Sequence, residues 1–146
     1  MIEAFDCFHT QAYIAGQWVD ALDGSTFEVL NPVDDSVIAE VANCGSRETE
    51  QAITAAHNSL IPWSTKPAKE KARLMRAWFE TIVANAETLA TLLTLEQGKP
   101  LAEARTEINY GASYIEWFSE ETKRIYGDVI PSPGADKRIL TIKQPV

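Results

Sequence analysis

One stretch of the sequence joins two helical patterns: Thr94-Leu95-Glu96-Gln97-Gly98-Lys99-Pro100-Leu101-Ala102-Glu103-Ala104. Gly98 is typical of the residue that follows the last turn of a helix, because glycine adopts the left-handed conformation without strain. Pro100 is typical of a helix start, where a missing backbone N–H leaves no hydrogen bond unmade. The stretch therefore predicts a helix over residues 87–97 and the start of a longer helix at Lys99-Pro100.

Toward the N-terminus, two further segments repeat apolar residues at helical spacing. The first begins at Ser46, a favourable N-cap, and Glu48 suits the positive end of the helix dipole. Ile61-Pro62-Trp63 is expected to end this helix, and Pro67 fits the first turn of the next one. The apolar stripes of the two helices are Ala52, Ile53, Ala56 and Leu60, then Ala68, Ala72, Met75, Phe79 and Ile82.

The longest helix is predicted to run from Lys99-Pro100 to about Tyr126, just before Gly127. Its first apolar stripe is Leu101, Ala104, Ile108, Ala112, Ile115 and Phe118. A second, aromatic stripe beside it is Tyr110, Tyr114 and Trp117. A helix that is apolar over so wide an arc usually contacts two different surfaces. Periodicity alone favours core packing over ligand binding for the aromatic stripe.

Short strands are expected at both ends of the chain. Residues 13–19, 26–30 and 37–41 have strand character, and Asp23-Gly24 is a turn pair that tolerates positive φ. We therefore predict a β-meander over residues 12–42. Residues 137–144 alternate loosely like a strand after the break Pro131-Ser132-Pro133-Gly134. The sequence thus predicts a mixed α and β fold: a β-meander, four helices over residues 46–126, and a C-terminal strand.

The overall composition argues against several classes of partner. The net charge of −8 disfavours nucleic acid and anionic membrane surfaces, which both attract basic proteins. No apolar stretch reaches the length of a membrane span, and the first residues lack the basic and apolar regions of a signal peptide. Cys7 and Cys44 match neither a metal site nor a disulfide framework. A cytoplasmic location is therefore expected.

The residues that could carry chemistry are few. Cys44 directly precedes a helix start, where the pKa of a thiol falls, but no histidine or other base lies nearby in sequence, so a half-buried turn residue is the favoured interpretation. His9 and His57 are isolated and are interpreted as ordinary surface residues. The carboxylates of the longest helix alternate with basic residues and predict a solvated face. Neither glycine-rich phosphate-binding pattern occurs in the chain.

The stretch over residues 94–104 resembles the LEQGKP signature of the NAD(P)-dependent aldehyde dehydrogenase family. Further stretches resemble the succinate-semialdehyde branch of that family: residues 107–121, 123–128, 130–131, 135–138 and 142–145. Tyr13-Ile14-Ala15-Gly16-Gln17-Trp18 and Asn31-Pro32 fit the opening strands of the family. The resemblance covers nearly the whole chain from about Tyr13 onward.

This resemblance implies an incomplete N-terminal part of the Rossmann-like aldehyde dehydrogenase fold. Residues 1–126 would form part of the coenzyme-binding domain, and residues 127–146 would begin the strand arm used in oligomerisation. The nucleophilic cysteine, the glutamate base, the glycine-rich coenzyme contacts and the arginine for the succinyl carboxylate are all expected beyond Val146. We therefore predict no catalytic and no cofactor-binding residue in this chain, and NAD or NADP only in the parent enzyme.

Two functional hypotheses follow from the resemblance. In the first, the chain is an excised or truncated segment of an enzyme that oxidises succinate semialdehyde to succinate. It is then inactive by itself, and it binds the missing remainder of the enzyme or self-associates. In the second, the chain is a free-standing helical interaction module derived from an aldehyde dehydrogenase.

The resemblance also assigns roles to five residues. The longest helix would line the tunnel through which the aldehyde enters, so Tyr110 and Trp117, and after them Tyr114, are expected to face the substrate. Many family members hold a structural monovalent cation with a main-chain carbonyl and an acidic side chain, which correspond to Leu30 and Glu96 here. A plain helix-terminal carboxylate is the alternative interpretation of Glu96.

Overall fold

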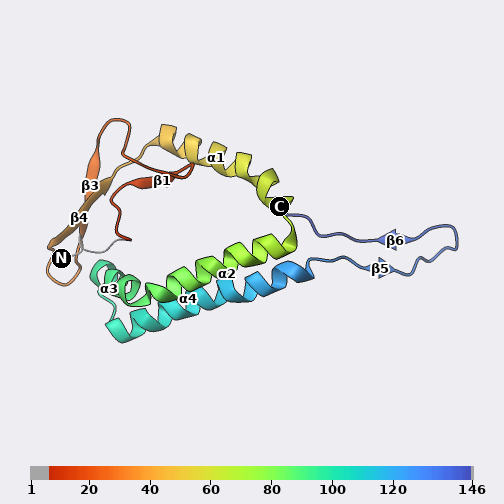
Figure 1. The fold of residues 1–146 in the computed structure, drawn as a ribbon. Coiled ribbons are helices and arrows are strands. Elements are labelled where there is room, and N and C mark those ends of the chain that lie inside the picture. Colours follow the sequence, from red (N-terminus) through yellow and green to blue (C-terminus); the bar gives the residue numbers. More distant parts are fainter. Residues whose placement is uncertain (1–6, 146) are drawn as a thin grey trace.

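Four helices make up about half of the computed structural model, which describes residues 7–145 (Figure 1). The expected mixed α and β fold is confirmed. The strands are β1 (Ala12–Ile14), β2 (Gln17–Val19), β3 (Thr26–Leu30), β4 (Val37–Ala42), β5 (Val129–Ile130) and β6 (Ile139–Leu140). The helices are α1 (Ser46–Ser64), α2 (Ala68–Ala84), α3 (Ala86–Gln97) and α4 (Leu101–Glu121), and α4 continues into the 3₁₀ turn η2 (Thr122–Arg124).

The meander expected over residues 12–42 takes the form of two separate antiparallel hairpins, β1–β2 and β3–β4. The segment predicted as one strand over residues 13–19 reverses in its middle. Ala15 (φ 52°) and Gly16 (φ 81°) form the two-residue loop that connects Ile14 to Gln17. Positive φ at both loop positions matches the right-handed twist of the flanking strands. A left-handed alanine gives no sequence signal, which is why the reversal was not predicted.

The helix boundaries follow the glycine and proline signals of the sequence, with two corrections. Gly98 ends α3 in the left-handed conformation (φ 69°), as expected. Pro67 and Pro100 each lie directly before a helix, and their carbonyl oxygens accept the first hydrogen bonds of α2 and α4. The break predicted at Pro62 is wrong, because α1 continues to Ser64, and the hydroxyls of Ser64 and Thr65 donate to the Ile61 carbonyl. The longest helix also ends earlier than Tyr126.

A buried carboxylate anchors the start of α1. Glu48 is 5% exposed, and its two oxygens accept hydrogen bonds from the backbone N–H groups of Leu22 (2.6 Å) and Gly45 (2.9 Å). The bond to Gly45 satisfies an N–H at the helix start, as in a capping box. The bond to Leu22 reaches back 26 residues. Glu48 therefore connects the turn after β2 to the N-terminus of α1.

Helix α4 packs against both α2 and α3 through small residues, and we call these three helices the helical stack (Figure 1). The buried apolar residues of this stack are Ala72, Ala90, Ala104 and Ala112. Ser119 completes the buried stripe of α4 where Phe118 was expected, and Phe118 is exposed. Seven residues after Ala112 the helix returns to the same face, so position 119 rather than 118 meets α2.

Residues 125–145 leave the helical stack as a long two-stranded extension, which we call the arm (Figure 1). The expected C-terminal strand is present, and β6 pairs with β5 through two residue pairs. At the base of the arm, the Asp128 N–H donates to the Thr141 hydroxyl and the Thr141 N–H donates to the Asp128 carbonyl. Within the strand expected over residues 137–144, residues 139–140 therefore find a partner in this chain.

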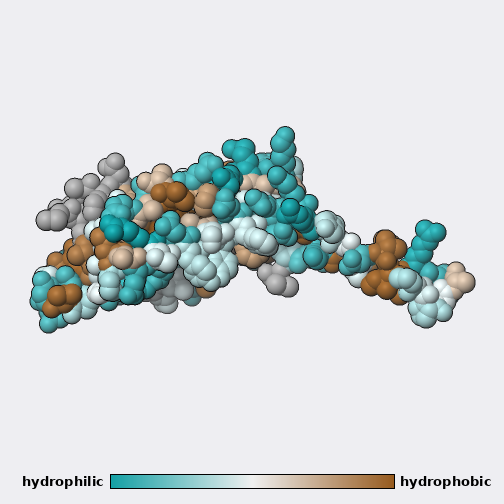
Figure 2. All heavy atoms as spheres, turned by 90° about the horizontal axis from the view of Figure 1, so that it is seen from below, coloured by the Kyte–Doolittle hydropathy of each residue, from teal (hydrophilic) through white to brown (hydrophobic). Residues whose placement is uncertain are grey.

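Much apolar surface stays in contact with solvent. The chain exposes 10969 Å², whereas a compact monomer of 16.2 kDa exposes about 7,500 Å². Ile53 and Leu60, from the apolar stripe predicted on α1, are both exposed, and Figure 2 shows apolar side chains gathered on the arm. Within residues 7–145, no helix combines the length and the apolar character that crossing a membrane requires.

Candidate functional site

The three aromatic residues predicted to face the substrate lie together on α4. At 3.6 residues per turn, Tyr110, Tyr114 and Trp117 stand about 150° around the helix from the buried Ala112. Tyr110 is 63%, Tyr114 49% and Trp117 64% exposed. We call this side of the helix the aromatic face. It is opposite the buried stripe, not beside it, so no element of the described chain covers it.

The two tyrosines of the aromatic face hold each other in place. Their rings meet edge to face with centroids 5.0 Å apart, and their hydroxyl groups share a hydrogen bond. This bond to the Tyr110 hydroxyl raises the pKa of Tyr114 above its ordinary value. The Tyr114 phenol is therefore neutral near neutral pH, and both side chains present a polar tip on an apolar body.

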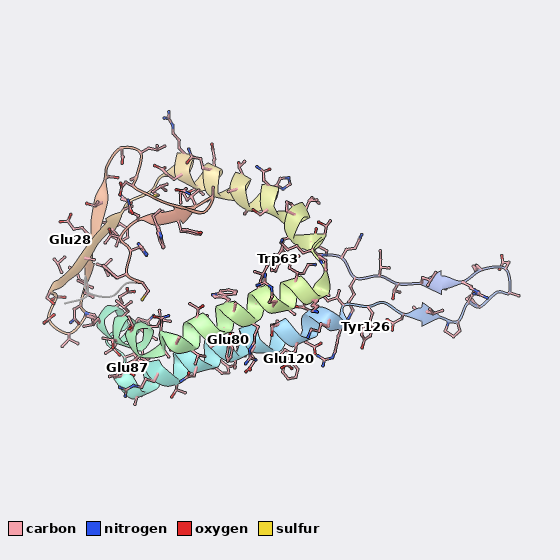
Figure 3. All side chains as sticks on the ribbon, in the orientation of Figure 1. Glu28, Trp63, Glu80, Glu87, Glu120 and Tyr126 are labelled. Carbon is pink, nitrogen blue, oxygen red and sulfur yellow. The ribbon has the colours of Figure 1, made fainter. Side chains whose placement is uncertain are left out.

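An open groove of about 540 Å³ runs along the aromatic face. Its lining residues are Tyr110, Ser113, Tyr114, Glu116, Trp117, Phe118 and Glu120. Glu116 is tied to α2, since its carboxylate accepts from the Arg76 guanidinium at 2.7 Å. Glu120 lies on the same helix one turn later (Figure 3). The groove thus combines aromatic walls with two acidic side chains at its border.

Ser113 and Phe118 were not among the predicted site residues. Phe118 was assigned to the buried stripe because it is strongly apolar, and a strict helical period would have excluded it. Ser113 carries no signal in the sequence, and its hydroxyl donates to the Tyr110 carbonyl at 2.7 Å. The carboxylates Glu116 and Glu120 were read as a solvated face, which agrees with their position at the border of an open groove.

The two segments proposed to hold a cation approach each other. Leu30 ends β3 immediately before Asn31-Pro32, and Glu96 lies in the last turn of α3 before Gly98. A Cβ atom added to Gly98 would stand 3.1 Å from Cγ of Pro32, so these two loops are in contact. Glu96 itself is exposed. The contact brings the neighbourhoods of both residues together.

The cysteine and histidine residues do not form a nucleophilic site. Cys44 is half-buried in the loop before α1, as the favoured interpretation expected. His9 stacks on Trp18 with ring centroids 3.8 Å apart and an interplanar angle of 17°, so it packs on the first hairpin. In the described part of the chain, no three His, Cys, Asp or Glu side chains converge as a metal site would require.

Comparison with known proteins identifies the family. Residues 18–146 match the aldehyde dehydrogenase family. The mitochondrial succinate-semialdehyde dehydrogenase of Oryza sativa subsp. japonica is 49% identical over 99% of this chain and 28% of its own length. The glutarate-semialdehyde dehydrogenase of Pseudomonas putida is 52% identical over 95% of this chain and 29% of its own length.

Solved structures agree in both fold and extent. The succinate-semialdehyde dehydrogenase from Burkholderia pseudomallei superposes with a TM-score of 0.90 at 49% identity, over 94% of this chain and 28% of that chain. The chain thus spans less than a third of the length of the relatives that it matches. Because the family match and the half-identical relatives cover nearly every residue, the chain belongs to the aldehyde dehydrogenase family.

Proposed function

We propose that this chain is the N-terminal segment of an NAD(P)+-dependent dehydrogenase for aldehydes that carry a second, acidic group, above all succinate semialdehyde. The names of its relatives support this substrate class. They specify succinate semialdehyde, glutarate semialdehyde and 3-sulfolactaldehyde, each of which has an anionic group besides its aldehyde. In this proposal residues 1–126 belong to the coenzyme-binding domain and residues 127–146 begin the oligomerisation arm.

The observation that carries the proposal is the aromatic face of α4, uncovered and opposite the buried stripe. In the whole enzyme Tyr110, Trp117 and Tyr114 would form one wall of the substrate tunnel. Flat aromatic walls exclude water and orient a short aliphatic chain without a specific bond. This segment therefore contributes substrate positioning, and the bond-making groups come from the rest of the enzyme.

The described residues do not fit a dinucleotide. A nicotinamide coenzyme of this class is held by a glycine-rich turn between a parallel strand and a helix. Within residues 7–145 every strand pair is antiparallel, and the loop from β4 to α1 contains a single glycine, Gly45. Coenzyme contacts are thus assigned to the remainder of the enzyme, and the isolated chain is expected to bind neither NAD+ nor NADP+.

A chimeric enzyme tests the proposed function. This chain replaces the matching segment of the NADP+-dependent succinate-semialdehyde dehydrogenase of Escherichia coli, which is 50% identical to it over 139 residues. We expect the chimera to reduce NADP+ with succinate semialdehyde, whereas the isolated chain shows no turnover. Trp117→Ala in the chimera should lower kcat/KM about tenfold. Trp78→Ala removes a tryptophan of similar exposure from α2 and should change kcat/KM less than twofold.

Two results would overturn the proposal. One is a folded chimera without activity, and the other is equal loss in the two tryptophan variants. Turnover by the isolated chain would instead refute the placement of the chemistry outside it.

The alternative function is that of a free-standing interaction module. Whether the isolated chain self-associates or stays monomeric distinguishes the two functions. About 3,500 Å² of excess surface is comparable to a large, obligate protein interface. As a segment, the chain should self-associate and bind the dye ANS on its uncovered apolar surface. Light scattering and ANS fluorescence measure both. A monodisperse monomer without ANS binding would favour the free-standing module.

We also propose that the Leu30 carbonyl and the Glu96 carboxylate hold a monovalent cation. The contact between Pro32 and Gly98 supports this, because it joins the two loops that directly follow the ends of β3 and α3, where these oxygens lie. In the chimera, replacing the large cation N-methylglucammonium by K+ should raise the Tm, and Glu96→Gln should abolish that difference. The control is Glu103→Gln, which removes another exposed carboxylate of this region. An unchanged response in Glu96→Gln would reject Glu96 as a ligand.

A further inference from the structure

Basic side chains converge on one groove between α2 and the end of α4. Lys69, Arg73 and Arg76 follow one another at spacings of four and three on α2, so they share one face of that helix. Lys123, from η2, joins them from the other side. The groove measures about 400 Å³, and its floor contains the buried Ala72 and Ser119.

This concentration of positive charge is unusual in a chain whose net charge is −8. Arg76 is already paired with Glu80 and Glu116, at 3.0 and 2.7 Å. Within residues 7–145, Lys69, Arg73 and Lys123 form no ion pair. Glu120, labelled on α4 in Figure 3, is the one carboxylate among the residues that line this groove. Three of the four cations are thus available to a ligand.

The three carboxylates already named offset much of this charge but leave the four cations with a net charge of +1. Glu70 precedes the groove on α2, but its carboxylate accepts from Lys66 at 2.9 Å. The pKa of Glu70 is lowered mainly by this bond and the charge of Lys66, and less by Arg73. Arg73 therefore acts on Glu70 only at a distance, and its guanidinium keeps its five donors.

We propose that this groove binds a compact oxyanion with at least two negative charges, such as a pyrophosphate group or a dicarboxylate. Arg73 supplies a planar fork that matches two oxygens, and Lys69 and Lys123 supply point charges on either side. The ligand bridges α2 and η2, two elements already held together by packing. The site is separate from the aromatic face, although Glu120 borders both grooves.

The affinity should be modest and dependent on salt. The cations are exposed and carried by flexible side chains, which must be ordered on binding. We expect a Kd on the order of 1 mM for inorganic pyrophosphate at low ionic strength. The expected Kd rises at least fivefold in 0.5 M NaCl, where the Debye length is only about 4 Å.

Titration of the whole chain with inorganic pyrophosphate, followed by NMR of backbone amides, tests the site. Saturable shifts should concentrate on residues 69–76 and 119–124. Lys69→Gln with Arg73→Gln should weaken binding at least fivefold. Lys137→Gln with Arg138→Gln removes the same two residue types from the distant arm and should change the Kd less than twofold. A parallel titration with succinate distinguishes phosphate from carboxylate ligands.

Lys123→Gln gives a second test that leaves α2 unaltered, and it should weaken binding at least twofold. If the double variant of α2 loses its helical circular dichroism signal, its weaker binding could come from unfolding. The Lys123→Gln variant then decides whether the groove binds the ligand. Equal weakening by the groove and arm variants would mean diffuse attraction and would overturn the proposal. The absence of saturation with both pyrophosphate and succinate would overturn it as well.

Discussion

The helical stack and the arm are built on opposite principles. In the stack, alanines at positions 90 and 104 are completely buried, which lets helices approach closely, and ion pairs span the helix contacts at Arg76–Glu116 and Arg105–Glu87. In the arm, both β5 and β6 are exposed at every residue and are joined by two residue pairs. The stack closes inside this chain, whereas the arm offers edges that another chain or segment can pair with.

The same contrast divides α4 itself. Its buried stripe belongs to the stack, and its aromatic face resembles the arm in having no cover from the described chain. Both uncovered regions expose large apolar side chains, for example Trp117 and Leu140. Within residues 7–145, the apolar residues that the chain buries completely are all small, whereas its large apolar residues are half-buried or exposed. This distribution is expected of a segment whose partners supply most of the hydrophobic core.

The largest expected effect comes from placing the same charge in each region. Ala104→Asp puts a carboxylate at a position with 0% exposure and should destabilise the stack by about 3–4 kcal/mol. Leu140→Asp, at a 70% exposed position of the arm, should change stability by less than about 0.5 kcal/mol. Urea unfolding followed by helical circular dichroism measures both. Comparable losses of unfolding free energy in the two variants would show that the arm is part of the same cooperative core.

A smaller effect is expected at the junction between the hairpins and α1. The hydrogen bond from the Leu22 N–H, followed by the other backbone donors, lowers the pKa of Glu48 below its ordinary value of 4.5. A carboxylate with a depressed folded pKa stabilises the fold above its unfolded pKa, and this contribution is lost as the pH falls through the folded value. The free energy of unfolding of the unmutated chain should therefore decrease as the pH is lowered below about 4.5.

Glu48→Gln removes that pH dependence and should lower the Tm by several degrees at pH 7, and this difference should shrink as the pH falls below about 4.5. Glu50→Gln is the matched control, because Glu50 is an exposed carboxylate in the same turn of α1. Thermal melts between pH 3 and 7 give the comparison. If Glu48→Gln and the parent lose stability in parallel as the pH falls, Glu48 is not the group that joins the hairpins to α1.

How far the sequence predicts the structure depends on the range of each signal. Gly98 and Pro100 predicted the boundary between α3 and α4, because both act through their own backbone conformation. The fourth helix and the grouping of Tyr110 with Tyr114 and Trp117 followed from helical spacing. Local geometry without a residue signature was missed, as at Ala15, whose positive φ divides the first strand.

Features that depend on packing between distant segments were also beyond sequence reasoning. The bond from Glu48 to Leu22 spans 26 residues, and the groove of Lys69 and Lys123 exists only because α2 and η2 lie side by side. The assignment of Phe118 to the buried stripe was wrong because the hydrophobicity of a residue was preferred to the period of the helix. The substrate and cation roles of Tyr110, Trp117, Tyr114, Leu30 and Glu96 stay predictions.

The smallest expected effect concerns the ion pairs at the edge of the stack. Arg105 donates twice to Glu87 (2.9 and 2.6 Å) and connects α4 to α3, whereas the Arg124–Glu121 pair (2.7 Å) lies within one segment. All four side chains are largely exposed, so solvent and salt screen both pairs. Arg105→Gln should lower the Tm by about 1–2 °C at low salt, and Arg124→Gln by less than about 1 °C.

The hydrogen bond from Arg105 lowers the pKa of Glu87 below its ordinary 4.5. The contribution of the Arg105–Glu87 pair to stability should therefore disappear as the pH falls through that lowered value. Calorimetric melts at pH 7 and pH 3, each with and without 1 M NaCl, make the test. A difference that persists at pH 3 in high salt would mean that Arg105 acts through the packing of its aliphatic stem on α3 and not through its charge.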